Sequence, residues 1–146
     1  MTAKTSIEIR LRIRFEPGGP ALGPGKIDLL EQISAGGSLV QAASELGMSY
    51  RRAWALLQEL AAMFGRPVVV TKVGGASGGG AQLTPFAHQL IASYRSAERT
   101  ALAAVSNEFA FAMRARTTRR RVAARGRAEK ARRRSSHARA RRTLMS

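Results

Sequence analysis

Hydrophobic and polar residues alternate near the start of the chain. Isoleucine, leucine or phenylalanine occupies every second position from Ile7 to Phe15, with glutamate or arginine between them. A period of two is typical of a strand with one buried and one exposed face. Glycine and proline crowd residues 17–25, which predicts a loop. We therefore expect a half-buried strand followed by an irregular connection.

The pattern then changes to a helical period. From Ile27 to Ile33 apolar residues recur at helical spacing, and glycines follow at Gly36-Gly37. Glycine is the residue that most often ends a helix. Ser38 and Gln41 then stand at the spacing of a capping box, in which each side chain bonds the other residue's backbone N–H. We expect a first helix that ends at the two glycines and a second that ends at about Leu46.

Gly47 lets the second helix stop abruptly, because glycine adopts left-handed backbone dihedrals at little steric cost. Ser49 can cap a third helix almost at once. The residues expected to face inward are Ala53, Trp54, Leu56, Leu57 and Leu60, and the helix ends near Gly65. Two short helices joined by such a turn form a helix-turn-helix unit, whose second helix enters a DNA major groove.

A hairpin and a long helix are expected next. Residues 68–73 are mostly β-branched, residues 74–80 are rich in glycine, and residues 81–83 can return as a second strand, so the segment reads as a wing. Thr84-Pro85 is a strong helix start. Apolar residues then recur at helical spacing from Phe86 to Met113, more than a small core needs. The surplus predicts a homodimer through this fourth helix.

Positive charge is concentrated at the end of the chain. The net charge is +16, and 14 of the 25 Lys and Arg residues lie from Arg114 onward, with Glu129 as the single carboxylate there. Such a block favours a polyanionic partner, in most cases nucleic acid. It contains few large apolar residues, so burial cannot offset the entropy lost on ordering. We expect this segment to be disordered when unbound.

These patterns predict a mainly α fold with a small β-hairpin: a winged helix-turn-helix followed by a long helix and a disordered basic tail. Residues 1–113 form the DNA-binding domain, with a dimerisation helix over about 85–113, and residues 114–146 form the Arg-rich tail. A chain of 146 residues has no room for a second full-sized domain.

Several classes of protein are disfavoured. Cysteine is absent, no apolar run approaches the ~20 residues of a membrane helix, and the N-terminus lacks the apolar core of a signal peptide. The histidines His88 and His137 have no carboxylate pair or metal-ligand spacing beside them. We expect a cytoplasmic protein that is not an enzyme, has no cofactor or metal, and does not bind membranes.

The same stretch of chain resembles a known family. The shared residues lie before the second helix, at the turn, in the wing and at the fourth helix: Gly37-Ser38, Gly47-Met48-Ser49-Tyr50-Arg51-Arg52-Ala53-Trp54, Gly74-Gly75-Ala76-Ser77-Gly78-Gly79-Gly80 and Leu83-Thr84. They resemble the N-terminal DNA-binding domain of ModE, the molybdate-responsive repressor, which is related to LysR-type regulators. The resemblance covers residues 7 to about 105. Ala87 departs from the pattern, in which glycine follows Leu-Thr.

The resemblance implies a dimeric transcription regulator that binds specific sequences of double-stranded DNA, with a link to molybdenum homeostasis. Full-length family members continue into small β-rich domains that bind molybdate between two subunits. This chain continues into the basic tail instead. We therefore expect a one-domain relative that reads DNA and has no molybdate site.

The residues expected to contact DNA are Ser38, Ser49, Tyr50, Arg51, Arg52, Lys72, Ser77, Gly78, Gly79, Arg119, Arg120 and Arg121. Arg51 or Arg52 can bond guanine O6 and N7 in bidentate fashion, the alternative being a solvated surface charge. Ser49 either bonds DNA or only caps its helix. The wing glycines either bring backbone amides to phosphate or form a plain hairpin tip.

A second function class stays open from the sequence alone. An architectural, nucleoid-type protein would coat nucleic acid mainly through the basic tail, with the winged domain serving for dimerisation. The tail predicts strongly salt-dependent binding with little sequence preference in either case. Deletion of residues 114–146 separates the two, because only a regulator keeps its preference for one sequence.

Overall fold

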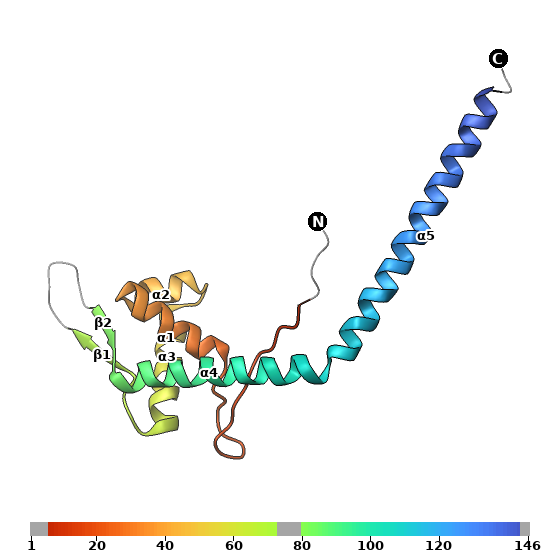
Figure 1. Ribbon diagram of the computed structural model, residues 1–146. Helices are drawn as coiled ribbons and strands as arrows, with labels where there is room; N and C mark the ends of the chain where they lie inside the picture. Colours follow the sequence, from red (N-terminus) through yellow and green to blue (C-terminus); the bar gives the residue numbers. More distant parts are fainter. Residues whose placement is uncertain (1–5, 73–79, 144–146) are drawn as a thin grey trace. The chain divides into compact units, whose positions relative to one another are not determined.

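The computed structural model describes residues 6–72 and 80–143 of the chain (Figure 1). The elements follow in the order α1 (Pro24–Gly36), α2 (Leu39–Glu45), α3 (Tyr50–Phe64), β1 (Val69–Lys72), β2 (Gly80–Leu83), α4 (Pro85–Glu108) and α5 (Ala110–Thr143). Contacts divide the chain into one compact unit of residues 8–102 and another that contains residues 103–143. The domain boundary expected after residue 113 stays a prediction.

The unit of residues 8–102 is a winged helix-turn-helix. Helices α1, α2 and α3 pack against one another, and α1 also contacts β2. Strands β1 and β2 form an antiparallel hairpin, from Val69 opposite Leu83 to Lys72 opposite Gly80. Helix α4 follows the hairpin (Figure 1). This order confirms the predicted fold class.

One hydrophobic core joins these elements. Burial of hydrophobic side chains is the main favourable term in folding. Trp54, which was expected to face inward, is half-buried and packs against this core. The most fully buried side chains come from all four helices of this unit and the segments that flank them: Leu22, Ile27, Leu29, Leu30, Ile33, Ala42, Ala43, Ala53, Leu57, Leu60, Val68, Ala87 and Tyr94.

Two glycines and two serines set the corners of the helix-turn-helix. Gly37 and Gly47 have φ angles of 67° and 63°, the left-handed region that ends a helix. Ser38 Oγ accepts the backbone N–H of the third residue after it at 3.3 Å, and Ser49 Oγ does the same at 3.1 Å. Both predicted caps are confirmed. The return bond of a capping box, from the Gln41 side chain, is not found among the described residues.

The prediction of a strand at the start of the chain is wrong. Side chains alternate between half-buried and exposed from Ile7 to Arg14, but among the described residues only Ile13 and Leu22 form a bridge, through two bonds of 2.8 Å. A strand needs a ladder of such bonds to a neighbour. The Tyr94 hydroxyl also donates to Leu11 O at 2.9 Å, and burial raises the pKa of Tyr94. Packing and single bonds hold this segment.

Helix α4 begins where predicted and extends beyond the hydrophobic core. Thr84 Oγ1 caps it by accepting a backbone N–H at 3.2 Å. Tyr94 is buried, whereas Leu102 and Val105 are half-buried, and Phe109, in the one-residue break before α5, is 53% exposed. The apolar stripe therefore continues beyond the part that the core covers.

The tail expected to be disordered is helical in the structure. Helix α5 extends to Thr143, and none of its side chains up to His137 is buried. The expectation rested on the absence of core-forming residues, yet alanine and arginine are among the best helix formers and the segment has no proline. An ion pair between Arg133 and Glu129, one turn apart at 3.3 Å, adds support. Local propensity gives a helix here without burial.

Candidate nucleic-acid interface

The first turn of α3 presents the polar surface of the helix-turn-helix. Tyr50, Arg51 and Arg52 follow the Ser49 cap and are all exposed, while Ala53 beside them is buried. Neither arginine forms an ion pair or a side-chain hydrogen bond with a described residue. Two guanidinium groups thus stand at the start of the second helix of the motif, the place from which this motif contacts base edges.

The Tyr50 ring is braced by Trp54. Their ring centroids are 6.3 Å apart with an angle of 81° between the planes, an edge contact that aromatic rings favour. Trp54 also lines, with Leu57 and Val68, a surface pocket of about 250 Å³ beside β1. Tyr50 itself remains 51% exposed. One edge of the tyrosine ring is therefore fixed while its other side faces solvent.

Ser38 and Ser49 act as helix caps, and each capping hydroxyl can still donate a hydrogen bond. In both residues the oxygen accepts a backbone N–H. A hydroxyl is a donor as well as an acceptor, so its proton can still be given to a phosphate oxygen. Contact of either serine with DNA stays a prediction.

The base of the wing lies at the corner between α1 and α2. The Ala81 N–H donates to Gly37 O at 3.0 Å. A Cβ at Gly80 would lie 3.3 Å from the same oxygen, so this close approach favours glycine. The bond places β2 beside Ser38 at the start of α2. Sequence reasoning missed it, because a contact between residues so far apart in the chain leaves no local pattern.

The remaining predicted contacts fall in two places. Lys72 is the last residue of β1 and pairs with Gly80, whereas Ser77, Gly78 and Gly79 lie outside the described residues. Arg119, Arg120 and Arg121 are exposed on α5, in the other compact unit. Successive residues of a helix point about 100° apart. These three arginines therefore cannot all face one flat surface.

A cluster of charges holds α4 against α1. Arg95 donates to Asp28 at 2.7 Å and to Glu31 at 2.8 Å, both on α1, and to Glu98 at 3.2 Å. The hydrogen bond from Arg95 is the main cause that lowers the pKa of Glu31, and the bond to Glu31 is the main cause that raises the pKa of Arg95. Sequence reasoning missed this cluster. It positions the helix that carries the apolar stripe.

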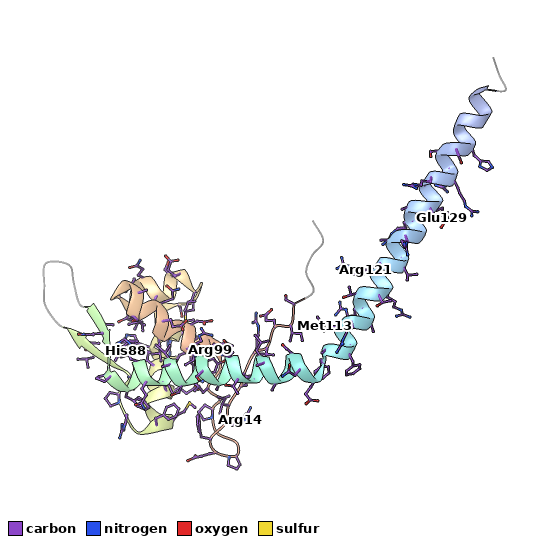
Figure 2. All side chains as sticks on the ribbon, in the orientation of Figure 1. Arg14, His88, Arg99, Met113, Arg121 and Glu129 are labelled. Carbon is purple, nitrogen blue, oxygen red and sulfur yellow. The ribbon has the colours of Figure 1, made fainter. Side chains whose placement is uncertain are left out.

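The two histidines lie exposed on different helices. His88 belongs to α4 (Figure 2), and His137 belongs to α5. Within residues 6–72 and 80–143 no three His, Asp or Glu side chains gather in a way that could hold a metal ion. None of the described helices has the length and apolar character needed to cross a bilayer.

Comparisons with known proteins give curated relatives but no family model. No family model matches the chain. The chain is 41% identical over 84 residues to the molybdenum-pterin-binding protein MopB of Rhodobacter capsulatus, a match that covers 58% of this chain and 31% of MopB. It is 38% identical over 71 residues to the DNA-binding transcriptional dual regulator ModE of Escherichia coli (strain K12), covering 49% and 27%.

Among solved structures, a crystal structure of a complex of CbnR_DBD with DNA aligns with a TM-score of 0.47 and 19% identity, over 60% of this chain and 95% of that one. The present chain spans less than a third of the length of either curated relative. The sequence identities confirm the resemblance found from the residues alone. Over about half of its length, this chain is a homologue of the ModE and MopB proteins.

Proposed function

We propose that this chain is a sequence-specific DNA-binding regulator of transcription of the ModE type, acting in the cytoplasm as a homodimer on double-stranded DNA. The observation that carries the proposal is the exposed first turn of α3, where Arg51 and Arg52 follow the Ser49 cap. In a helix-turn-helix this turn enters the major groove. The Escherichia coli relative, named as a DNA-binding transcriptional regulator, supports the same reading.

The predicted contacts have different roles. Arg51 or Arg52 bonds a guanine, which is worth about 1–3 kcal/mol of discrimination. Tyr50, Ser49 and Ser38 bond phosphates or base edges, and phosphate contacts set the register on the duplex. The bond from Ala81 to Gly37 supports a role for the wing beside them, because it fixes the base of the hairpin next to the start of α2. We propose that Lys72, Ser77, Gly78 and Gly79 contact the phosphate backbone of the DNA.

The apolar stripe of α4 supports the homodimer. Apolar residues recur at helical spacing at Leu102 and Val105 on α4, at Phe109 in the break that follows, and at Met113 on α5. Phe109 leaves 53% of its surface exposed. Burial of such surface contributes roughly 25 cal/mol per Å². A symmetric dimer would read two half-sites about one helical turn of DNA apart. The expected operator is therefore palindromic.

The basic segment from residue 114 supplies affinity without sequence preference. Neutralised phosphates release counterions, so binding weakens steeply as salt rises. The winged domain supplies selectivity. The name of the Rhodobacter capsulatus relative, a molybdenum-pterin-binding protein, supports a link to molybdenum homeostasis. We propose no molybdate site in this chain.

The exposed length of α5 favours one alternative, an architectural protein that coats nucleic acid. Selection of bound sequences from a random DNA pool at about 150 mM salt separates the two, because weak phosphate contacts are largely screened at that strength. An enriched palindrome supports the regulator. Tight binding without enrichment supports the architectural protein.

Deletion of residues 114–146 provides an independent comparison. A regulator loses affinity but keeps its order of preference among sequences, since selectivity resides in the winged domain. A coating protein loses almost all binding. Titration of labelled operator and of an unrelated duplex with both forms of the chain distinguishes these results.

A further inference from the structure

Helix α5 carries its positive charges in two rows. At about 100° per residue, one row lies within about 20° of a single line along the helix. The other row lies within about 60° of the line on the opposite side. The first row consists of Arg114, Arg121, Arg125 and Arg132. The second row consists of Arg116, Arg119, Arg120, Arg127, Lys130 and Arg134. All ten side chains are exposed. Figure 2 labels Arg121 of the first row.

The two sides between the rows are nearly neutral. Arg133 belongs to neither row, and it is paired with Glu129 at 3.3 Å. The other positions there are held mainly by alanine, serine and threonine. Four of their hydroxyls donate to carbonyls of the helix itself, at 2.9 to 3.1 Å: those of Thr117, Thr118, Ser135 and Ser136. The helix therefore has two cationic edges separated by small, uncharged sides.

A disordered polycation has no need of such an arrangement, because its charges can reach phosphates from any position. Two opposite rows on a helix match a channel with anionic walls on both sides. A helix with its side chains is about 10–12 Å across. The major groove of B-DNA is about 12 Å wide and is flanked by two phosphate backbones. The rows extend for about 30 Å, similar to basic helices that lie across that groove.

From this match we infer that α5 binds as a helix in the major groove of duplex DNA, with the first row on one phosphate backbone and the second row on the other. The inference rests on the proposed function, since DNA is the partner in both. It adds a second, sequence-independent groove contact to the one made by α3. The small side chains between the rows would face the bases, which explains why the tail binds DNA without sequence preference.

The test moves arginines off the first row without changing composition. In the off-row variant, Arg114→Ala is combined with Ala115→Arg, and Arg125→Ala with Ala124→Arg. Net charge is unchanged, and helix propensity is nearly so because both residue types are strong helix formers. Each moved arginine points into a side between the rows. The full-length chain is used throughout.

A matched control makes the same kind of exchange within the rows. Arg121→Ala is combined with Ala128→Arg, which stays within about 40° of the first row's line. Arg116→Ala is combined with Ala123→Arg, which stays on the second. Circular dichroism at 222 nm checks that the wild type and both variants have equal helix content.

Binding is measured on a duplex of random sequence at several salt concentrations. For the off-row variant we expect affinity at least tenfold lower near 150 mM salt, and a slope of log K against log salt reduced by about 2, since each phosphate contact contributes about 0.9. The in-row control should match the wild type. Equal affinity and slope for all three proteins would overturn the inference, and so would an affinity loss that only follows a loss of helix.

Two further outcomes bear on the groove itself. Duplex RNA of the same sequence should bind more weakly and without dependence on the rows, because its major groove is too deep and narrow. A complex that holds two labelled duplexes for each α5 helix would place the rows on separate molecules and overturn the single-groove arrangement. Failure of the proposed function looks different, since the wild type would then show no preference for any DNA sequence.

Discussion

At Gly47 the φ angle is 63°, whereas Gly25 lies in the first turn of α1, and a Cβ at either would meet no atom within 4 Å. We expect Gly47→Ala to lower the free energy of unfolding by about 1–2 kcal/mol, the cost of a left-handed L-residue. Gly25→Ala should raise it by up to about 1 kcal/mol, through the entropy of the unfolded chain. Denaturant titration measures both.

A third variant isolates the cause. Asparagine tolerates left-handed dihedrals, so Gly47→Asn should retain most of the stability that Gly47→Ala loses. If alanine at positions 25 and 47 changed stability by the same amount, backbone conformation would not be what Gly47 contributes.

Arg95 lies among Asp28, Glu31 and Glu98, and its side chain is only 27% exposed. Arg95→Leu should lower the free energy of unfolding by about 1–3 kcal/mol, because it leaves three carboxylates together without their cation. Arg99→Leu, on the exposed side of the same helix, is the control and should change it by less than about 0.5 kcal/mol. Similar losses for both would contradict a special role for Arg95.

The same cluster sets a dependence on pH. In the folded chain the pKa of Glu31 lies below its ordinary value of 4.5. Glu31 therefore binds a proton less readily when folded, so its contribution is complete above pH 4.5 and is lost as pH falls through the lowered value. The difference in the free energy of unfolding between the wild type and the Arg95→Leu variant should narrow as the pH falls below 4.5. A gap that stays constant down to about pH 3 would count against the ion pair.

At the scale of elements, the first turn of α3 is where selectivity is expected. Arg51→Ala or Arg52→Ala should weaken binding to a selected operator by about 5- to 150-fold and relax the preference at one base position. Arg99→Ala removes one positive charge outside the helix-turn-helix and serves as the control. Fluorescence anisotropy on the operator and its single-base variants measures both effects. If all three variants lost a small and equal amount of affinity, Arg51 and Arg52 would be solvated surface charges that do not contact a base.

Helix ends could be predicted because they depend on neighbouring residues. Gly37, Ser38, Gly47 and Ser49 define the turn by their own chemistry, and the exposed start of α3 follows directly from it. The bonds from Ala81 to Gly37 and from Arg95 to α1 could not be predicted, since they join residues far apart in the chain.

The two incorrect expectations have physical reasons. The period of two from Ile7 to Phe15 reports which side chains are buried, but it cannot supply the neighbouring strand that a ladder requires. In α5 the absence of large apolar residues excludes a core, yet it does not exclude a helix, because alanine and arginine favour helical dihedrals without tertiary contacts. Burial and secondary structure are separate properties in both segments.

At the scale of the whole molecule, the apolar stripe predicts the state of association. Val105→Glu with Phe109→Glu should weaken the dimer at least tenfold, because two carboxylates would be buried without partners. Ala104→Glu with Asn107→Glu adds the same charge on the opposite side of the helix and should leave the dimer intact. Sedimentation equilibrium at micromolar concentration measures both. A wild-type monomer there would remove the dimer from the proposal.

The hydroxyl of Tyr94 reaches the carbonyl of Leu11 across 83 positions of sequence. Contacts between such distant residues form late, because a long loop must close before they gain anything. The start of the chain should therefore dock after the helices have assembled and detach before they unfold. In hydrogen exchange, Tyr94→Phe should speed exchange of the Ile13 amide and leave that of Leu57 unchanged. The docking of the start of the chain, as a separate step in folding, therefore depends on this one hydrogen bond.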